Sequence, residues 1–450
     1  MTDRSVSPPT TLDRAYEFLG GDMEERGCAA IPAQACTDVP RNFLLNVANG
    51  AATKLAEQLA SPGLVLPWLL SAIGAPTGLV GLLVPARQAG SLLPQLAVAG
   101  QIRRIRRRKW VWVGAGAIQA AMLLLMAVAA LALPPTAAGL AIVAFLSIFS
   151  VVSGMGSVAF QDVVGKTVPQ GKRGRLLAQR AAIGGALTLA AAILLKSVLS
   201  DEASVGSYAL LLAVAAALWA FAAIAFAVVI ELPGATEGGR SMIREVRSGF
   251  RLVRDVPGYR RFLVARALLV AVEVATPFFA LHAQGLSDEN LGALAAYIFA
   301  LGLAEVLSNP VWGALADKSS RRVMALSGLV AAAAGFFALG LALLPPAAWN
   351  QYVYAPIFIL IGAAQAGVRV GRKTYLVDAA PERDRPLYVA FANSAVGVVT
   401  LAAGALGLLA ALIGVPALIA LLALLALAGA AAAWALHEAD RMVIGKGAKH

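Results

Sequence analysis

Long apolar stretches alternate with short polar or proline- and glycine-containing turns along most of the chain. Each stretch has about 20 or more mostly apolar residues, enough for a helix to cross about 30 Å of hydrocarbon. A helix satisfies its backbone hydrogen bonds within the segment, as lipid requires, and the short alternating strands of a membrane barrel do not occur. The pattern predicts helices at residues 42–71, 78–100, 110–133, 137–161, 177–198, 207–231, 260–283, 290–315, 322–344, 352–375, 386–410 and 414–436.

Composition supports this assignment. Hydrophobic residues make up 59% of the 450 and charged residues only 14%, whereas soluble domains carry about 25% charged residues. The predicted fold class is an all-α polytopic membrane protein with 12 transmembrane helices. The polar, acidic segment before residue 42 predicts no cleavable signal peptide. Cys28 and Cys36 lie in that segment and match no zinc pattern, so we interpret them as ordinary thiols.

Basic residues occupy every second connection between the predicted helices. Of the 37 Lys and Arg residues, 32 lie in the two tails and in this one set of loops, and none lies in the other set. The positive-inside rule therefore places both termini in the cytoplasm. This distribution also accounts for the net charge of +12, so nucleic acid is not an expected partner.

The two halves of the chain resemble each other at an offset of about 210 residues. Pro67 with Gly81 in the first half corresponds to Pro277 with Gly292 in the second, and a basic loop follows each set. We predict a cytoplasmic tail (1–41), a six-helix bundle (42–231), a cytoplasmic connector (232–259), a second six-helix bundle (260–437) and a tail (438–450). Apolar positions in 241–255 predict an amphipathic helix in the connector, lying on the inner membrane surface.

The segment Gly313-Ala-Leu-Ala-Asp317-Lys-Ser-Ser-Arg321-Arg322 is similar to the loop signature of the major facilitator superfamily. Together with two six-helix halves and a basic connector, it implies that superfamily's fold of two pseudo-symmetric bundles. The resemblance further implies that Asp317, Arg321 and Arg322 form a gating motif, with Asp317 at a helix N-terminus. The corresponding first-half loop lacks the aspartate, and helix 177–198 lacks the glycine-proline signature of drug antiporters.

Ionisable residues inside the predicted spans are costly and mark functional positions. Helix 42–71 carries a polar stripe that includes Asn49, and we expect Lys54 and Glu57 to pair three residues apart. Similar depths suggest a second pair, Glu305 with Arg369. The predicted substrate and proton pathway comprises Asn49, Lys54, Glu57, Arg87, Glu273, Glu305 and Arg369.

Glu273 and Glu305 are the candidate proton-coupling acids, since a carboxylate at this depth is either protonated, paired with Arg266 or Arg369, or hydrated. Purely structural ion pairs are the alternative. The cations counted inside the spans outnumber the acids, which favours an anionic or zwitterionic solute. No metal, cofactor or enzyme motif is present in the sequence.

The sequence thus predicts a monomeric secondary transporter of a small organic solute, coupled to protons, in the cell inner membrane. A receptor or assembly factor of the same fold, which does not transport, and a multidrug exporter are the alternatives. The sequence shows no catalytic site, so the protein is not expected to be an enzyme.

Overall fold

The computed structural model describes residues 11–20, 37–102, 105–169, 172–198, 204–233, 242–286, 291–345, 351–381 and 385–438, almost all of them helical. The first half of the molecule comprises α4 (Val39–Leu59), α5 (Val65–Ala72), α6 (Thr77–Ile102), α7 (Lys109–Ala132), α8 (Pro135–Thr167), α9 (Arg173–Val198) and α10 (Val205–Ala227). The second half comprises α12 (Pro257–Leu268), α13 (Val270–Val274), α14 (Thr276–Leu286), α15 (Leu291–Leu341), α16 (Gln351–Ala379), α17 (Arg385–Ala402), η2 (Ala403–Ala405), α18 (Leu406–Ile413) and α19 (Val415–Trp434).

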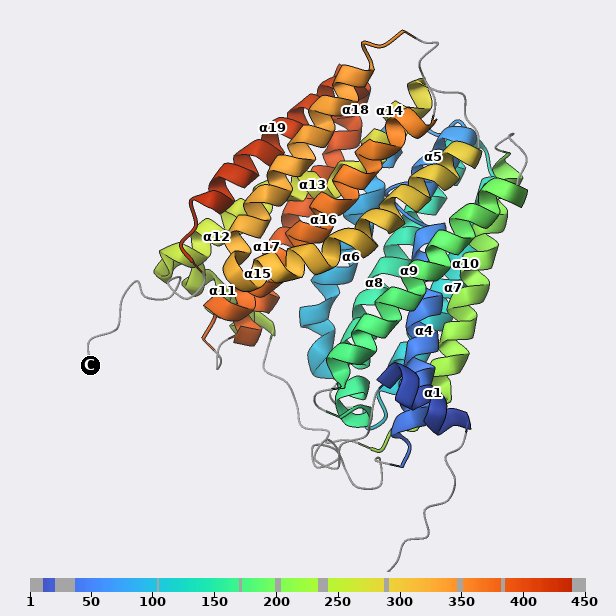
Figure 1. Ribbon diagram of the computed structural model, residues 1–450, viewed down its shortest axis with the longest axis vertical. Coiled ribbons are helices and arrows are strands. Elements are labelled where there is room, and N and C mark those ends of the chain that lie inside the picture. Colours follow the sequence, from blue (N-terminus) through green and yellow to red (C-terminus); the bar gives the residue numbers. More distant parts are fainter. Residues whose placement is uncertain are drawn as a thin grey trace, which may run out of the picture.

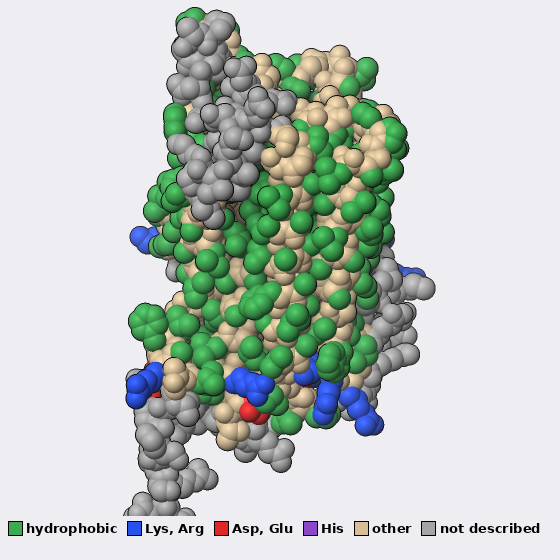
Figure 2. Space-filling view, turned by 90° about the vertical axis from the view of Figure 1, so that its right-hand side faces the viewer, with side chains coloured by type: hydrophobic (Ala, Val, Ile, Leu, Met, Phe, Trp, Pro, Cys, Tyr) green, Lys and Arg blue, Asp and Glu red, His purple; other side chains and the backbone are tan. Residues whose placement is uncertain are grey.

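The protein is an all-α polytopic membrane protein. Ten helical segments of the described residues are long and apolar enough to cross a membrane. The pair α4–α5 and the helix α6 lie beside them in the first half, so the arrangement is compatible with the twelve predicted crossings. In Figure 1 the helices run side by side in two groups, and Figure 2 shows a wide hydrophobic belt with Lys and Arg side chains near its lower edge.

Three predicted spans are interrupted. The first is not one helix: a turn at residues 60–64 separates α4 from α5, because Pro62 has no N–H to donate and Gly63 weakens the helix. The seventh divides into α12, α13 and α14, and the eleventh contains the short η2. Conversely, α15 includes both the eighth and ninth spans, which meet at an extended residue, Ser319 (φ −166°, ψ 99°).

Within each half, the helices pack against one another. In the first half α7 lies against α8 and α10, and α4 lies against α9 and α10. In the second half α15 packs on α16 and α19. Stacked rings support each group, with Trp112 and Trp219 at 6.2 Å between centroids in one, and Phe262 and Tyr375 at 5.1 Å in the other.

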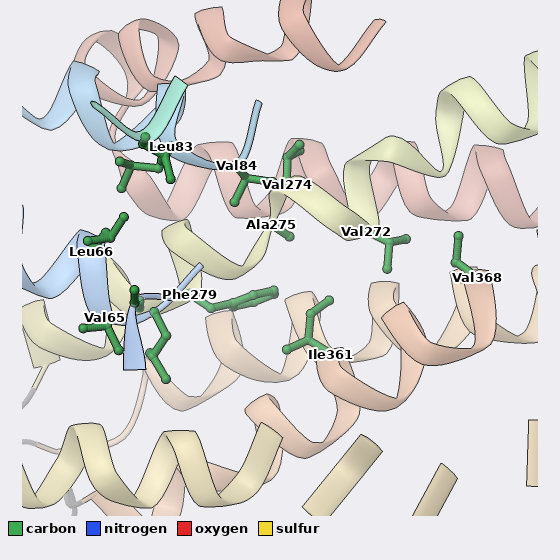
Figure 3. Packing of buried hydrophobic residues seen from close by; sticks show 14 of the residues in the cluster. Val65, Leu66, Leu83, Val84, Val272, Val274, Ala275, Phe279, Ile361 and Val368 are labelled. Carbon is green, nitrogen blue, oxygen red and sulfur yellow. The ribbon is translucent and has the colours of Figure 1, made fainter. Parts of the chain in front are cut away.

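The halves meet through α6 with α17 and α18, and through α9 with α15. The backbones of α6 and α18 lie close together at Gly81 and Gly407, where a Cβ built on Gly81 would lie 2.3 Å from the Cα of Gly407. Figure 3 shows Leu83 and Val84 of α6 near Val274 and Ala275, in agreement with the contacts of α6 with α13 and α14. In Figure 1 the two groups converge at the end that carries α5, α14 and α18, which we call the α5 end.

The opposite end, called the α1 end, carries two helices outside the bundles (Figure 1). The helix α1 (Thr11–Gly20) was not predicted. Its Tyr16 is 2% exposed and packs edge-on against Phe43 of α4, and Arg175 of α9 donates a 2.8 Å hydrogen bond to the carbonyl of Leu19. Cys28 and Cys36 lie outside the described residues.

The connector helix is confirmed as α11 (Met242–Asp255). It also contacts the protein: the Phe250 and Phe391 rings are 5.3 Å apart, and Gly249 lies so close to Phe391 that no side chain would fit. The helix is therefore anchored to α17 and α12 in addition to any contact with lipid.

Candidate functional site

A cavity of about 260 Å³ lies between the two halves. Its first-half lining comes from α4, the turn that follows α4, α6, α7 and α8, and its second-half lining from α13, α14, α15 and α16. Six of the seven pathway residues selected from the sequence line it: Lys54, Glu57, Arg87, Glu273, Glu305 and Arg369. Residues more than 300 positions apart in the chain thus share one polar chamber.

Glu305 connects the two halves. Its Oε2 accepts a hydrogen bond from Lys54 Nζ at 2.7 Å, and its Oε1 accepts one from Arg369 Nη2 at 2.7 Å. The pair with Arg369 predicted from helix depth is confirmed. The predicted pair between Lys54 and Glu57 is wrong, because Lys54 extends across to α15 instead.

Glu57 pairs with Arg87 of α6, the distance from Arg87 Nη2 to Glu57 Oε1 being 2.9 Å. The guanidinium carbon of Arg87 also lies 5.3 Å from the centroid of the Phe149 ring, within the range of a cation–π contact. A buried arginine keeps its proton and needs an acid or an anionic ligand. In this conformation Glu57 supplies that negative charge from within the first half.

Of the three alternatives left open for Glu273, pairing with Arg266 or Arg369 does not occur in the structure, whereas Glu273 does line the cavity. Its nearest cation is Arg372, one turn beyond Arg369, with Nη1 at 3.5 Å from Glu273 Oε1. Arg266 instead donates a hydrogen bond to Asn393 of α17 at 2.9 Å. A side-chain amide of α16, that of Gln365, holds the helix break beside Glu273 by donating to Thr276 Oγ1 at 2.7 Å.

Asn49, the seventh pathway candidate, is not among the residues that line the cavity. It is fully buried and its Nδ2 donates to the carbonyl of Ala222 on α10 at 2.9 Å. The polar stripe of α4 therefore serves two faces, with Asn49 packing against α10 and Lys54 and Glu57 facing the cavity. From sequence spacing alone, Asn49, Lys54 and Glu57 were equally strong candidates for the pathway.

The charges of the cavity balance. Three cations and three acids line it, whereas the excess of positive charge counted from the sequence included Arg266, which does not line it, and Lys196, whose side chain lies outside the described part. A net positive cavity therefore no longer supports an anionic solute. A preference for an anionic solute therefore has to come from where individual cations lie in the cavity.

The predicted gating motif lies at the kink of α15, where the eighth and ninth spans meet at Ser319. The side chain of Asp317 is outside the described part of the chain, and Arg322 is exposed. Arg321 Nε donates to Glu438 at 2.6 Å, and Ser319 donates to the same carboxylate. Partial burial raises the pKa of Glu438, but the hydrogen bonds and the charge of Arg321 outweigh burial and hold the pKa below its usual range.

The first half has a corresponding cluster that sequence reasoning missed. The fully buried carboxylate of Glu231 pairs with Lys166 at 2.9 Å and accepts from the backbone N–H groups of Arg108 and Lys109 at 3.1 and 2.8 Å. Arg108 also pairs with Asp162. Glu231 and Glu438 both follow the last helix of a half and both bind the loop between that half's second and third spans. That repeat, an acid just after each bundle, was the available signal.

Comparisons with known proteins agree with this arrangement. The family model described as Major Facilitator Superfamily matches residues 293–447, most of the second half. A structure of a variant of the nucleoside transporter NupG matches with a TM-score of 0.71 and 12% identity, covering 88% of this chain and all of the other. The chain therefore has the fold of the major facilitator superfamily transporters, and most of its second half matches that superfamily's model.

Other superfamily structures align over a similar length. A D-xylose–proton symporter matches with a TM-score of 0.64 and 14% identity over 91% of this chain and 99% of the other. The POT family transporter PepTSo matches with a TM-score of 0.69 and 10% identity over 90% and 99%. By sequence, the uncharacterized protein Rv2209 of Mycobacterium tuberculosis is 27% identical over 390 residues, covering 81% of this chain and 71% of its own.

Proposed function

We propose that this protein is a member of the major facilitator superfamily and a secondary transporter that moves a small organic solute by alternating access, coupled to protons. The observation that carries the proposal is the cavity, whose charged lining comes from both halves and lies next to the contacts that join them. A solute held there touches both halves at once. Its binding free energy can then change with their relative position, which alternating access requires.

We assign the α1 end to the cytoplasm. The basic loops and the connector helix α11 lie at that end (Figure 1), and Lys and Arg side chains follow the same edge of the hydrophobic belt in Figure 2. Under the positive-inside rule both termini are then cytoplasmic, and the membrane is the cell inner membrane. The convergence of the halves at the α5 end makes this conformation closed to the outside.

Proton coupling requires an acid whose charge affects the conformational switch. Glu305 satisfies this condition because its carboxylate binds a cation from each half. Glu273 is a weaker candidate, since its partner Arg372 belongs to the same half and lies at 3.5 Å. We therefore assign coupling to Glu305 and a supporting role to Glu273.

The clusters around Glu438 and Glu231 lie at the end assigned to the cytoplasm, and they act as gates in the same transport cycle. Arg321 joins the loop between the eighth and ninth spans to the end of α19 through Glu438, and Glu231 joins the corresponding first-half loop to the end of α10. Each cluster fixes helix ends within one half, so each half moves as a unit. We propose that Asp317 contributes an inter-helix contact that forms when the cytoplasmic side closes.

Reconstitution into liposomes with an imposed pH gradient tests the proposal. Labelled organic acids and amino acids, together with the solute types of the similar structures (nucleosides, peptides and xylose), form the panel. We expect at least one solute to accumulate. Glu305→Gln should abolish accumulation and retain exchange, because exchange needs no net proton movement, while Glu273→Gln should slow accumulation only.

Asp255→Asn, the same change of acid to amide on the exposed side of α11, is the matched control and should transport normally. If no solute exchanges or accumulates in wild-type vesicles, the protein is a non-transporting member of the fold. If Glu305→Gln accumulates solute at the wild-type rate, Glu305 is not the coupling residue.

A further inference from the structure

The contacts of the Glu305 carboxylate resemble those that a bound anionic ligand would make. Both of its oxygens are occupied, one by Lys54 of α4 and the other by Arg369 of α16, each at 2.7 Å. Every other ion pair given above joins two residues of the same half. Two cations from opposite halves therefore converge on one small oxyanion, which happens to belong to the protein.

The site can be reached by a small molecule. The side chains of Lys54, Glu305 and Arg369 are 25%, 21% and 43% exposed, and all three line the cavity of about 260 Å³. That volume is slightly below the range of about 300–1,000 Å³ that is usual for small-molecule pockets, so the solute would be small. Apolar side chains from α7 and α8, those of Leu123, Met126, Leu146 and Phe149, line another part of the cavity and can hold the remainder of a solute.

Charge balance decides how an anionic solute enters. Every lining cation described already has an acid partner: Lys54 and Arg369 share Glu305, and Arg87 pairs with Glu57. A carboxylate added from solution therefore finds no free lining cation, and uptake of a proton by one of these acids supplies one. Among the three acids, only Glu305 releases two lining cations when it is neutralised, because Glu57 holds Arg87 alone and the partner of Glu273 is not a lining residue.

Resting on the proposed function, we propose that Glu305 is an internal substitute for the carboxylate of the transported solute. The proton binds a carboxylate oxygen of Glu305, the two ion pairs break, and the carboxylate of a small organic acid takes over the hydrogen bonds of Lys54 and Arg369. When the solute leaves, Glu305 loses the proton and regains both cations. One proton then crosses with each carboxylate, and the step is electroneutral.

Anion binding to the purified full-length protein in lipid nanodiscs tests this inference without a known substrate. The probes are acetate, succinate and inorganic phosphate, each compared with sodium chloride at equal ionic strength, and acetamide as the uncharged match of acetate. Thermal unfolding reports binding, since a ligand of the native state raises the midpoint. We expect acetate and succinate to stabilise the protein and acetamide to have no effect.

The pH dependence of anion binding tests whether Glu305 must be protonated before the anion binds. If one proton must bind Glu305 before the anion, the half-saturating concentration rises about tenfold for each pH unit above the pKa of that carboxyl. Glu305→Gln should bind the anions with no such slope, and adding Lys54→Met or Arg369→Met to Glu305→Gln should remove binding. Asp255→Asn, the matched change outside the cavity, should keep the wild-type slope.

Three results would overturn the inference: anion binding that is equal at all pH values in the wild type, a slope that persists in Glu305→Gln, or stabilisation by methylammonium in place of the anions. The wild-type measurement needs no variant, so a variant that fails to fold does not remove the test. Solute transport in liposomes with pH-independent anion binding would refute this inference and leave the proposed function intact.

Discussion

Adding one methyl group at the contact between α6 and α18 should open the cavity toward the outside. A Cβ on Gly81 would lie 2.3 Å from both the Cα and the backbone nitrogen of Gly407, whereas ordinary contacts begin near 3.4 Å. Neither obstacle is a flexible side chain, so the helices must separate by about 1 Å, which is the shortfall between those two distances. Gly81→Ala therefore acts on the conformation that is closed at the α5 end.

The size of the effect follows from overpacking. Inserting a methyl group into a closely packed contact costs about 1–3 kcal/mol. Only the conformation in which α6 touches α18 bears that cost, so the ratio of outward-open to closed molecules should rise about 5- to 140-fold, given that 1.4 kcal/mol is a factor of ten. The change shifts populations and leaves the charged lining as it is.

Cysteine accessibility measures that ratio. Cys28 and Cys36 are replaced by Ser, and Ser61, which lines the cavity, is replaced by Cys as the reporter. A membrane-impermeant maleimide is added outside right-side-out vesicles. The labelling rate follows the outward-open fraction and should rise with Gly81→Ala until that fraction saturates.

The matched control is Gly114→Ala on α7, where a Cβ meets nothing within 4 Å. It should leave the rate of labelling at position 61 unchanged. Equal rates in the Gly81 and Gly114 variants would refute the assignment of the glycine contact as the outer closure, and so would faster labelling from the cytoplasmic side in Gly81→Ala.

Further outcomes follow from the same structure. An impermeant reagent added outside should label Ser204→Cys, ahead of α10, and should not label Arg106→Cys, and the reverse pattern would invert the topology. Glu231→Gln should lower the unfolding free energy by about 3–5 kcal/mol, because a fully buried carboxylate loses its charge beside Lys166. In thermal unfolding the corresponding change Glu438→Gln, at a carboxylate 37% exposed, should cost less than about 1 kcal/mol. Asp317→Asn should slow transport and leave insertion and folding intact, and an unchanged rate in liposomes would limit its role to topology.

The ion pair between Glu438 and Arg321 makes the stability of the protein depend on pH. Since the pKa of Glu438 is held below its usual range, the stabilisation from its link to Arg321 is present above the ordinary carboxyl pKa. It is lost as the pH falls through the lowered value in the folded protein. The link between Glu438 and Arg321 at the end of α19 therefore persists at neutral pH.

Much of this protein was determined by the sequence alone. Lipid leaves the backbone no alternative to helices, so the apolar segments located the spans to within a few residues, and the basic loops indicated an even number of crossings. The cost of an ionised group in lipid also selected the cavity: six of the seven residues chosen on that ground line it. These are properties of each segment in its solvent and need no knowledge of neighbouring helices.

The tertiary structure decided the partners. Spacing suggested that Lys54 would pair with Glu57 on its own helix, but packing of the two halves brings Glu305 within 2.7 Å and leaves Glu57 to Arg87. An ionised side chain in a membrane span needs a partner of opposite charge, and the sequence shows which side chains have that need. Which charge it finds depends on distances across helices that only the packed bundles define.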